Sequence, residues 1–335
     1  MLMTSPSSEQ RAKVVDPRPT SRKASRTDMP RFRKRGFTII ETLTVAAICS
    51  VCTSLLVPAM QSARRDARDT ICMNNLKRLG LALHNYHDVY GGFPPAWNTR
   101  EPDGAGYATT GWQSSILPYI DQAPLYNLLD TRNGVYTSLD KDTGLLKTRL
   151  DAYRCPLDSV TDTNPFRGDW GTSNYVGNFG STPIPRWSDS STFWPGQPTT
   201  PLTGVGRFGL SASPRDNGIF AMNRTIRIRD CIDGTSNTLM VGERSILGKA
   251  ALWPGPRSNY QESDVLADGS FASPINRSDT GYSSRHANGI VHFLLCDGSA
   301  RAIHERIESN NNTGHDMGIL QKLSSRNDGQ IIGQF

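Results

Sequence analysis

The chain has 335 residues, a formal net charge of +6 and a hydrophobic fraction of 36%. This length allows one large domain or two modest ones, and the hydrophobic fraction excludes a protein built mainly of membrane-spanning segments. Residues 1–36 hold ten Lys and Arg against three Asp and Glu, so the rest of the chain is close to neutral. Because no basic patch remains outside this segment, nucleic acid is excluded as an expected partner.

The first 36 residues form a basic leader. Residues 1–28 are rich in Ser, Thr, Pro and Arg, a composition typical of disordered segments. The sequence RFRKRG then occupies residues 31–36. A start at Met29 would leave a leader of eight residues, so the true start stays open between Met1 and Met29.

An apolar segment follows the leader. From Phe37 to Met60, twenty-four residues carry a single charge, that of Glu41. This length suffices for one membrane-spanning helix, which needs about 20 apolar residues. The basic residues before it predict that its amino side is cytoplasmic. No small-residue cleavage site follows the apolar run, as one would in a secretory signal, so we expect residues 37–60 to span the membrane.

The carboxylate of Glu41 is unusual inside an apolar segment. A charge there is costly, and it indicates a function and a partner. If the chain is cleaved after Gly36, the new α-amino group of Phe37 lies four residues from Glu41. One helical turn separates the two, which favours opposite charges. The alternative is a plain signal anchor that contains a chance glutamate.

The stretch Lys34-Arg35-Gly36-Phe37-Thr38 with Glu41 resembles the cleavage and methylation site of type IV prepilins and type II secretion pseudopilins. The resemblance implies that prepilin peptidase cleaves between Gly36 and Phe37 and that the new amino terminus of Phe37 is methylated. It also implies that Glu41 pairs with the amine of a neighbouring subunit during assembly. Pro58 falls where many pilins carry a helix-kinking proline.

Helical character continues beyond the apolar segment. Apolar residues recur at intervals of three and four, at Leu76, Leu79, Leu83, Tyr86 and Tyr90. This spacing predicts an amphipathic helix over 61–92, which Gly91-Gly92 and the prolines after them end. We therefore expect one continuous helix from Phe37 to Tyr90, on the order of 80 Å long.

Residues 93–335 are predicted to form a loop-rich globular ectodomain. Two short helical pieces are expected in 112–130, with breaks at Pro118 and Pro124, and a short helix over 317–324. Strands are expected at 174–180, 218–222, 225–228, 238–243, 289–295 and 300–303. Asp297-Gly298 is a strong hairpin signal between the last two. The predicted fold class is α+β, a pilin-like lollipop in which a long N-terminal helix, transmembrane and then amphipathic, packs on a domain with an antiparallel β-sheet.

Several stretches resemble a second signature, that of a bacterial family of prepilin-like proteins with a C-terminal domain of unknown function. That family is named for a His, a nine-residue gap and Asp-Gly. The matching pieces are CMNNLK (72–77), LALHNYH (81–87), FPP (93–95), Trp112 with LPYI (117–120), RCP (154–156), DGTSNT (233–238) through Gly242-Glu243, SSRH (283–286) and CDGS (296–299). The resemblance makes Asp233, Gly234, Ser236, Asn237, Thr238, His286, Asp297 and Gly298 signature residues. Ten residues, not nine, separate His286 from Asp297, which suggests an inserted turn residue near Asn288-Gly289.

Six cysteines divide by location. Cys49 and Cys52 lie in the apolar segment and are expected to be buried small residues without a redox role. The other four would lie outside the cytoplasm, where disulfides persist: Cys72, Cys155, Cys231 and Cys296. Four thiols allow three pairings, and the sequence cannot choose among them. Cys72 with Cys155 is the preferred candidate.

Two further clusters suggest chemistry. Asp233 and Glu243 are candidate calcium ligands because calcium prefers oxygen, although Asp, Ser, Thr and Asn also form self-bonded turns; no other cofactor is expected. His286 and Asp297 suggest a catalytic pair. A hydrolase also needs a nucleophile and an oxyanion hole, and no G-x-S-x-G elbow is present. We therefore expect a structural role and no enzymatic activity.

The sequence thus predicts a prepilin-like or pseudopilin-like structural subunit. It would be processed after Gly36 and anchored by one span in the inner membrane, with a short cytoplasmic leader and a periplasmic or extracellular C-terminal domain. It would stay there or assemble with other pilin-like subunits into a filament linked to secretion or surface display. An alternative is a membrane-tethered binding module whose loops in 133–215 recognise a carbohydrate, peptide or small ligand. A third reading is an ectodomain hydrolase using His286 or Asp297.

Overall fold

A computed structural model describes residues 36, 38–99, 108–129, 144–158, 161–184, 217–257, 262–310 and 317–332. The predictions made for the basic leader, for Phe37 and for most of the loops in 133–215 lie outside these residues. The chain divides into two compact units, residues 1–57 and 58–335. Each unit is considered by itself below.

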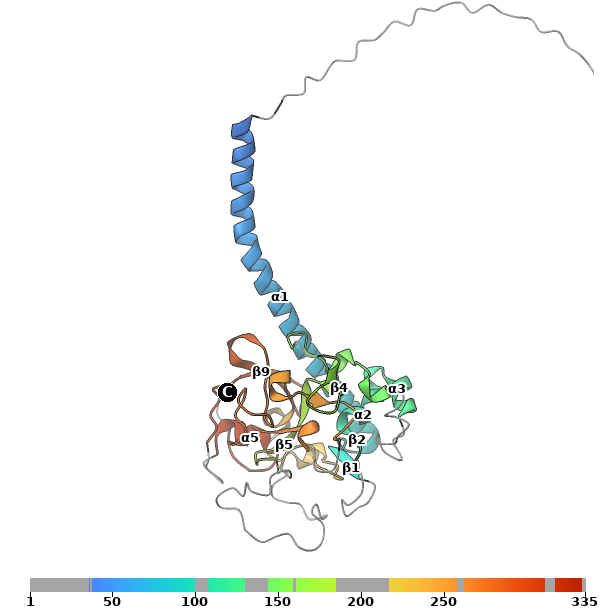
Figure 1. Ribbon diagram of the computed structural model, residues 1–335. Helices are drawn as coiled ribbons and strands as arrows, with labels where there is room; N and C mark the ends of the chain where they lie inside the picture. The colour runs from blue at the N-terminus through green and yellow to red at the C-terminus, as the bar shows by residue number, and fades with distance from the viewer. Residues whose placement is uncertain are drawn as a thin grey trace, which may run out of the picture. The chain divides into compact units, whose positions relative to one another are not determined.

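Helix α1 (Ile39–Tyr90) is a single helix of 52 residues (Figure 1). It begins at a capping box formed by Thr38 and Glu41. The Thr38 backbone N–H donates to Glu41 Oε2 at 2.8 Å, and the Glu41 N–H donates to Thr38 Oγ1 at 3.3 Å. These bonds satisfy two backbone donors at the helix start. They therefore explain why α1 starts at Ile39, two residues after the predicted start.

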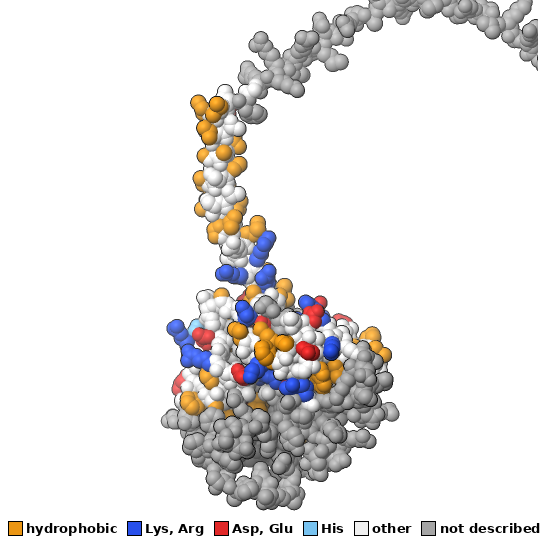
Figure 2. All heavy atoms as spheres, in the orientation of Figure 1, with side chains coloured by type: hydrophobic (Ala, Val, Ile, Leu, Met, Phe, Trp, Pro, Cys, Tyr) orange, Lys and Arg blue, Asp and Glu red, His pale blue; other side chains and the backbone are white. Residues whose placement is uncertain are grey.

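The described part of the first unit consists of Gly36, Thr38 and the apolar turns of α1 up to Val57. Its large side chains are exposed: Ile39, Ile40, Leu43, Val45, Ile48, Val51, Leu55, Leu56 and Val57. In Figure 2, hydrophobic side chains lie along the visible face of these turns. Within the described residues, α1 is the one helix that is long and apolar enough to cross a membrane. Cys49 and Cys52 are exposed instead of buried, because the part of this unit that the structure describes has no second element to cover them.

The second unit contains the remaining turns of α1, which pack one stripe. Leu76, Leu79 and Leu83 are fully buried, whereas Tyr90 is 61% exposed. The buried stripe is therefore shorter than the predicted one and ends about two turns before the helix does. Gly80 lies within it, and a Cβ there would come within 2.8 Å of a methyl carbon of Leu294. The glycine thus permits a close approach of α1 to the sheet.

The main sheet of this unit has five strands in the order β10-β9-β6-β5-β8. Its strands are β5 (Tyr175–Gly180), β6 (Leu239–Glu243), β8 (Leu266–Asp268), β9 (Ile290–Leu295) and β10 (Ala300–His304). All pairs are antiparallel except β5 with β8, which is parallel. The sheet is therefore mixed and not purely antiparallel as predicted, because β8 is joined to the sheet by a crossover and not by a hairpin.

Two hydrophobic clusters cover the two faces of this sheet. Alternate residues of β9, namely Val291, Phe293 and Leu295, pack with α5 (Ile319–Ser324). Leu294, between them, packs in the other cluster with the buried stripe of α1. Figure 1 labels β9, β5 and α5 in this unit. The α+β fold class is confirmed, with the sheet held between α1 on one face and α5 on the other.

Smaller elements complete the unit. Two further sheets pair β1 (Trp97–Thr99) with β2 (Ala108–Gly111), and β3 (Thr163–Asn164), β4 (Trp170–Ser173) and β7 (Ala251–Leu252). The segment 112–130 forms three short helices instead of two: α2 (Trp112–Ser115), the 3-10 helix η1 (Leu117–Ile120) and α3 (Ala123–Leu128). Pro118 and Pro124 lie in the first turns of η1 and α3, where the missing N–H costs nothing. The prolines therefore start these helices.

The strands predicted at 218–222 and 225–228 are wrong. Only an isolated bridge joins Ala221 to Arg224. The hydrogen bonds of this segment go elsewhere: Phe93 N–H donates to the carbonyl of Ile226, and Ala96 N–H to that of Ala221. Apart from this bridge, the segment therefore pairs irregularly with the residues that follow α1.

Candidate functional site

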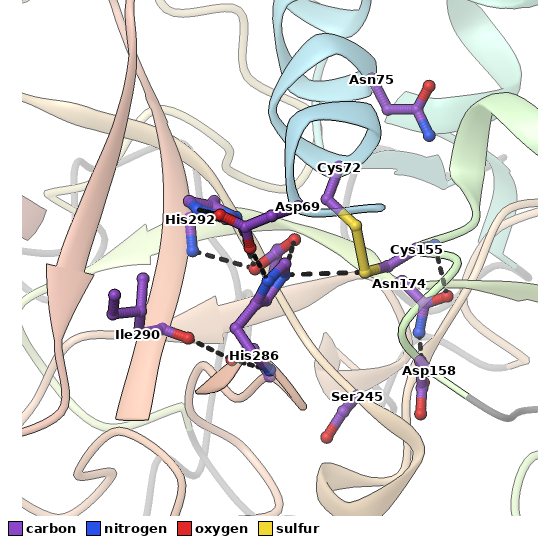
Figure 3. Close-up of polar contacts among 12 residues, drawn as sticks. Asp69, Cys72, Asn75, Cys155, Asp158, Asn174, Ser245, His286, Ile290 and His292 are labelled. Atoms are coloured by element: carbon purple, nitrogen blue, oxygen red, sulfur yellow. Dashed lines mark hydrogen bonds and ion pairs between the residues drawn. A yellow bond between two sulfur atoms is a disulfide. The ribbon is translucent and has the colours of Figure 1, made fainter. Parts of the chain in front are cut away.

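A disulfide ties α1 to the globular unit. Cys72 on α1 bonds to Cys155, with the two Cα atoms 5.2 Å apart. The Cys155 backbone N–H donates to Asn174 Oδ1 at 3.0 Å, and Asn75 Nδ2 donates to the carbonyl of Arg154 at 2.9 Å. Both buried bonds hold the Cys155 side of the bridge, and Figure 3 shows the disulfide with the bond between Cys155 and Asn174. The remaining pair of candidates, Cys231 and Cys296, is unbridged and buried.

Beside this disulfide lies a cluster of two imidazoles and two carboxylates. Asp69 comes from α1, Glu243 ends β6, His286 precedes β9 and His292 lies within β9. In Figure 3 the side chains of Asp69, His286 and His292 point toward one another. Glu243, His286 and His292 are buried, while the side chain of Asp69 is 42% exposed.

Each imidazole of the cluster lies between the two carboxylates. His286 Nδ1 contacts Asp69 Oδ1, and His286 Nε2 lies 3.0 Å from Glu243 Oε1. His292 Nε2 lies 3.7 Å from Asp69 Oδ2, and His292 Nδ1 lies 3.5 Å from Glu243 Oε2. The two rings meet edge to face with centroids 4.3 Å apart. Each imidazole therefore has one nitrogen toward Asp69 and the other toward Glu243.

Burial and charge act in opposite directions on these groups. Burial favours neutral His286, but the hydrogen bond and charge of Glu243, followed by the charge of Asp69, outweigh it and raise the pKa of His286. Burial likewise favours neutral Glu243, yet the hydrogen bond of His286 and the nearby imidazole of His292 lower the pKa of Glu243. The cluster thus holds an ionised carboxylate next to a readily protonated imidazole.

His286 and Asp297 do not form a pair. Asp297 Oδ1 accepts the Ser299 N–H at 2.8 Å, and Gly298 has φ 82°. Asp297 and Gly298 therefore build the turn between β9 and β10, as the Asp-Gly signal predicted. A 3-10 turn, Ala287–Gly289, follows His286. Asn288 has φ 61° there and Gly289 φ 68°, and the predicted insertion at this place stays a prediction.

Comparison with protein families matches residues 61–310 to a family described as a protein of unknown function, DUF1559. The chain belongs to this family. The matched range contains the disulfide, the histidine–carboxylate cluster and the β9–β10 turn, but neither Gly36 nor Glu41. No curated protein and no solved structure gives a match. The resemblance to a family with a domain of unknown function is thus confirmed, while the prepilin motif lies outside the matched range.

In this DUF1559 domain the signature loop 233–238 has a structural explanation. Asp233 accepts the N–H groups of Asp328 at 2.7 Å and Gly329 at 2.8 Å. Gly234 has φ 95°. Further bonds close the loop, from Asn237 Nδ2 to the carbonyl of Asp233 and from Thr238 Oγ1 to that of Gly234, while Ser236 is exposed. Asp233 and Glu243 share no partner in the described residues, so the structure gives no calcium site formed by the two.

Sequence reasoning missed Asp69 and His292. Asp69 lies three residues before Cys72, so helical spacing places both on one face of α1. His292 alternates with Val291 and Phe293 within β9. These spacings could have indicated the two residues, but only the packing of α1 on β9 brings them together.

Two hollows differ sharply in size. The cavity beside the cluster, lined in part by Cys155, Glu243 and Arg244, holds about 10 Å³, which is at most one water molecule. A more open hollow of about 320 Å³ is lined by Arg224, Thr225, Ile226, Arg229, Asp230, Ile232, Arg326 and Asn327. The small cavity therefore cannot hold an organic substrate, whereas the second hollow is large enough for a small ligand.

Proposed function

We propose that the protein is a prepilin-like structural subunit, cleaved after Gly36, that is anchored in the inner membrane or assembles with other pilin-like subunits into a filament. Prepilin peptidase is the processing partner, and Phe37 becomes the methylated amino terminus. The filament serves secretion or surface display. On this proposal the protein is structural and not an enzyme.

The observation that carries the proposal is Glu41 in the first turn of an apolar, exposed helix. In the uncleaved chain its carboxylate accepts the Thr38 N–H, so it is already partly satisfied by a capping box. Cleavage after Gly36 adds a positive charge next to this carboxylate. The negative charge of Glu41 then has a partner in its own chain or in a neighbouring subunit.

The disulfide supports the proposed orientation. Disulfides persist in oxidising compartments and are rare in the cytosol. The bridge from Cys72 to Cys155 therefore favours a globular unit outside the cytoplasm. The leader, with ten Lys and Arg, favours a cytoplasmic amino side. The disulfide and the charge of the leader thus favour the same orientation.

The proposal is tested by identifying the amino-terminal residue of the protein isolated from cell membranes. We expect N-methylated Phe37, found by mass spectrometry of the terminal peptide. A terminus at Met1 or Met29, with Gly36-Phe37 intact, would refute processing. Gly36→Leu serves as the matched variant, because a bulky residue at the cleavage site should leave the leader in place.

Glu41→Gln separates the charge from the cap. Glutamine also completes a capping box, so the helix start is preserved while the negative charge is lost. We expect the variant to be cleaved and to reach the membrane but to be absent from sheared extracellular filaments. Asp66→Asn, on an exposed turn of the same helix, is the control and should assemble normally. Normal assembly of Glu41→Gln would refute the role of the charge.

A second candidate function is a membrane-tethered binding module. The hollow that includes Arg224, Arg229 and Arg326 favours an anionic carbohydrate or small ligand. Heparin is a suitable probe, and binding should weaken in Arg229→Ala but not in Arg277→Ala, an exposed arginine outside the hollow. Equal binding by both variants would refute this hollow as the site.

A further inference from the structure

We propose that Asp69, His286 and His292 bind a divalent transition-metal ion, and that Glu243 orients both imidazoles from behind. The proposal rests on the cluster alone and does not depend on processing or filament assembly. The sequence analysis named Asp233 and Glu243 as candidate calcium ligands and predicted no transition-metal site.

Three donor atoms converge on one point. One ligand atom from each of Asp69, His286 and His292 lies within 4.8 Å of the other two. The ring nitrogens that face Asp69 are His286 Nδ1 and His292 Nε2. Zinc binds imidazole nitrogen and carboxylate oxygen at about 2.0–2.2 Å. Donors around such an ion are therefore separated by about 3–4 Å, and His292 Nε2 lies 3.7 Å from Asp69 Oδ2. The ion would replace the direct contact between Asp69 Oδ1 and His286 Nδ1.

Glu243 lies behind the two imidazoles, in the position of a carboxylate that accepts the second ring N–H of a metal-binding histidine. Histidine ligands almost always donate their second ring N–H to a carboxylate, a carbonyl or water, which fixes the tautomer. Here one carboxylate serves both rings, at 3.0 Å from His286 Nε2 and 3.5 Å from His292 Nδ1. Glu243 Oε2 also accepts the backbone N–H of His292 at 2.9 Å. Its position is therefore fixed by β9 itself.

One buried ring nitrogen supports metal binding by His292. His292 Nδ1 is buried without a hydrogen-bond partner, in a residue only 1% exposed. A metal ion on Nε2 would place the ring proton on Nδ1, from where it can donate to Glu243. The charges also balance, because two carboxylates offset one dication in a poorly solvated site.

The donor set and the exposure define the class of ion. Two imidazoles and a carboxylate suit zinc and related transition metals, whereas calcium takes oxygen ligands. Thiolates are not available, since Cys72 and Cys155 are joined to each other. The partly exposed side of Asp69 leaves an entry path and a position for water. Three protein ligands with an open position are typical of zinc sites that are not purely structural.

The test uses the full chain without an affinity tag, solubilised in detergent under non-reducing conditions and stripped of metal with a chelator. Zinc is titrated by calorimetry, and bound metal is counted by elemental analysis after dialysis. We expect one equivalent of zinc with a micromolar or tighter dissociation constant, and a higher thermal unfolding midpoint with zinc than without. Absence of binding, or tighter binding of calcium than of zinc, would overturn the proposal.

Variants locate the ion. Asp69→Asn and His292→Ala should weaken zinc binding by about 100-fold or more, and Glu243→Gln by about 10- to 100-fold, as expected for an outer-shell partner. Asp69→Asn changes little in size at a half-exposed position, so it keeps the test valid if His292→Ala fails to fold. His304→Ala, an exposed histidine on β10, and Asp66→Asn are controls. Unchanged binding by Asp69→Asn would place the ion elsewhere and refute the site.

Discussion

The two ends of α1 are apolar in different ways. Between Ile39 and Val57 apolar side chains occur all round the helix and are exposed. Between Cys72 and Leu83 the buried residues follow one stripe, and the residues between them, such as Lys77 and Leu81, are exposed. A helix that is apolar all round needs an apolar environment on every side, whereas a stripe needs only one packed face.

The two ends of this helix should therefore differ in how much they contribute to the free energy of unfolding of the domain. The stripe contributes buried area to the DUF1559 domain, whereas the apolar end has its large side chains exposed within its own unit. Substitutions of the same type at the two ends should therefore affect the unfolding of the domain very unequally. Two measurements test this contrast, and a third, with a smaller expected effect, concerns the cluster that Asp69 of α1 forms with the sheet.

The largest effect is expected from cysteine. Cys72→Ser with Cys155→Ser should lower the free energy of unfolding by about 2–5 kcal/mol, because the bridge closes a long loop in the unfolded chain. Cys49→Ser, in the apolar end of the same helix, should leave this free energy unchanged. Urea unfolding followed by tryptophan fluorescence measures both. Equal effects at the two ends would contradict the division of α1.

A smaller effect is expected from leucine. Leu79→Ala should cost about 3 kcal/mol, because Leu79 is fully buried and truncation leaves a cavity against the sheet. Leu55→Ala should not change the unfolding of the domain, since Leu55 is 70% exposed. The same urea measurement decides this. A loss in Leu55→Ala as large as that in Leu79→Ala would show that the apolar end packs on the domain after all.

The smallest effect concerns pH in the chelator-treated chain. The folded pKa of His286 is raised above its ordinary 6.5, mainly by Glu243 against the opposing effect of burial. Its stabilisation is therefore fully present below pH 6.5 and is lost as the pH rises through the raised value. Stability should fall over this window in the unsubstituted protein, and His286→Gln should flatten the fall. An identical pH profile in His286→Gln would exclude His286 as its source.

Much of the fold follows from local sequence signals. The periodicity of α1, the apolar runs of β6 and β9 and the Asp297-Gly298 turn each specify an element from a few neighbouring residues. The segment 218–228 misled the prediction because its hydrogen bonds are made with residues 93–97 and with Asn178. Those partners lie far away in sequence, so no local pattern reports them.

The site divides in the same way. His286 was found through a motif, but its partners Asp69 and His292 depend on how α1 lies against β9. The predicted link of His286 to Asp297 was drawn from a shared motif, whereas the folded chain uses Asp297 for its own turn. Motif membership indicates which residues matter, and packing decides which of them meet.

The cross-link between Cys72 and Cys155 also has a mechanical meaning. The two cysteines are 83 positions apart, and that much chain could otherwise extend by roughly 280 Å. A tensile force applied along α1 is carried from the helix into the domain through a covalent bond. The chain between the two cysteines cannot be extended by this force, because the disulfide bypasses it. Other parts of the domain should therefore unfold before the domain separates from the helix.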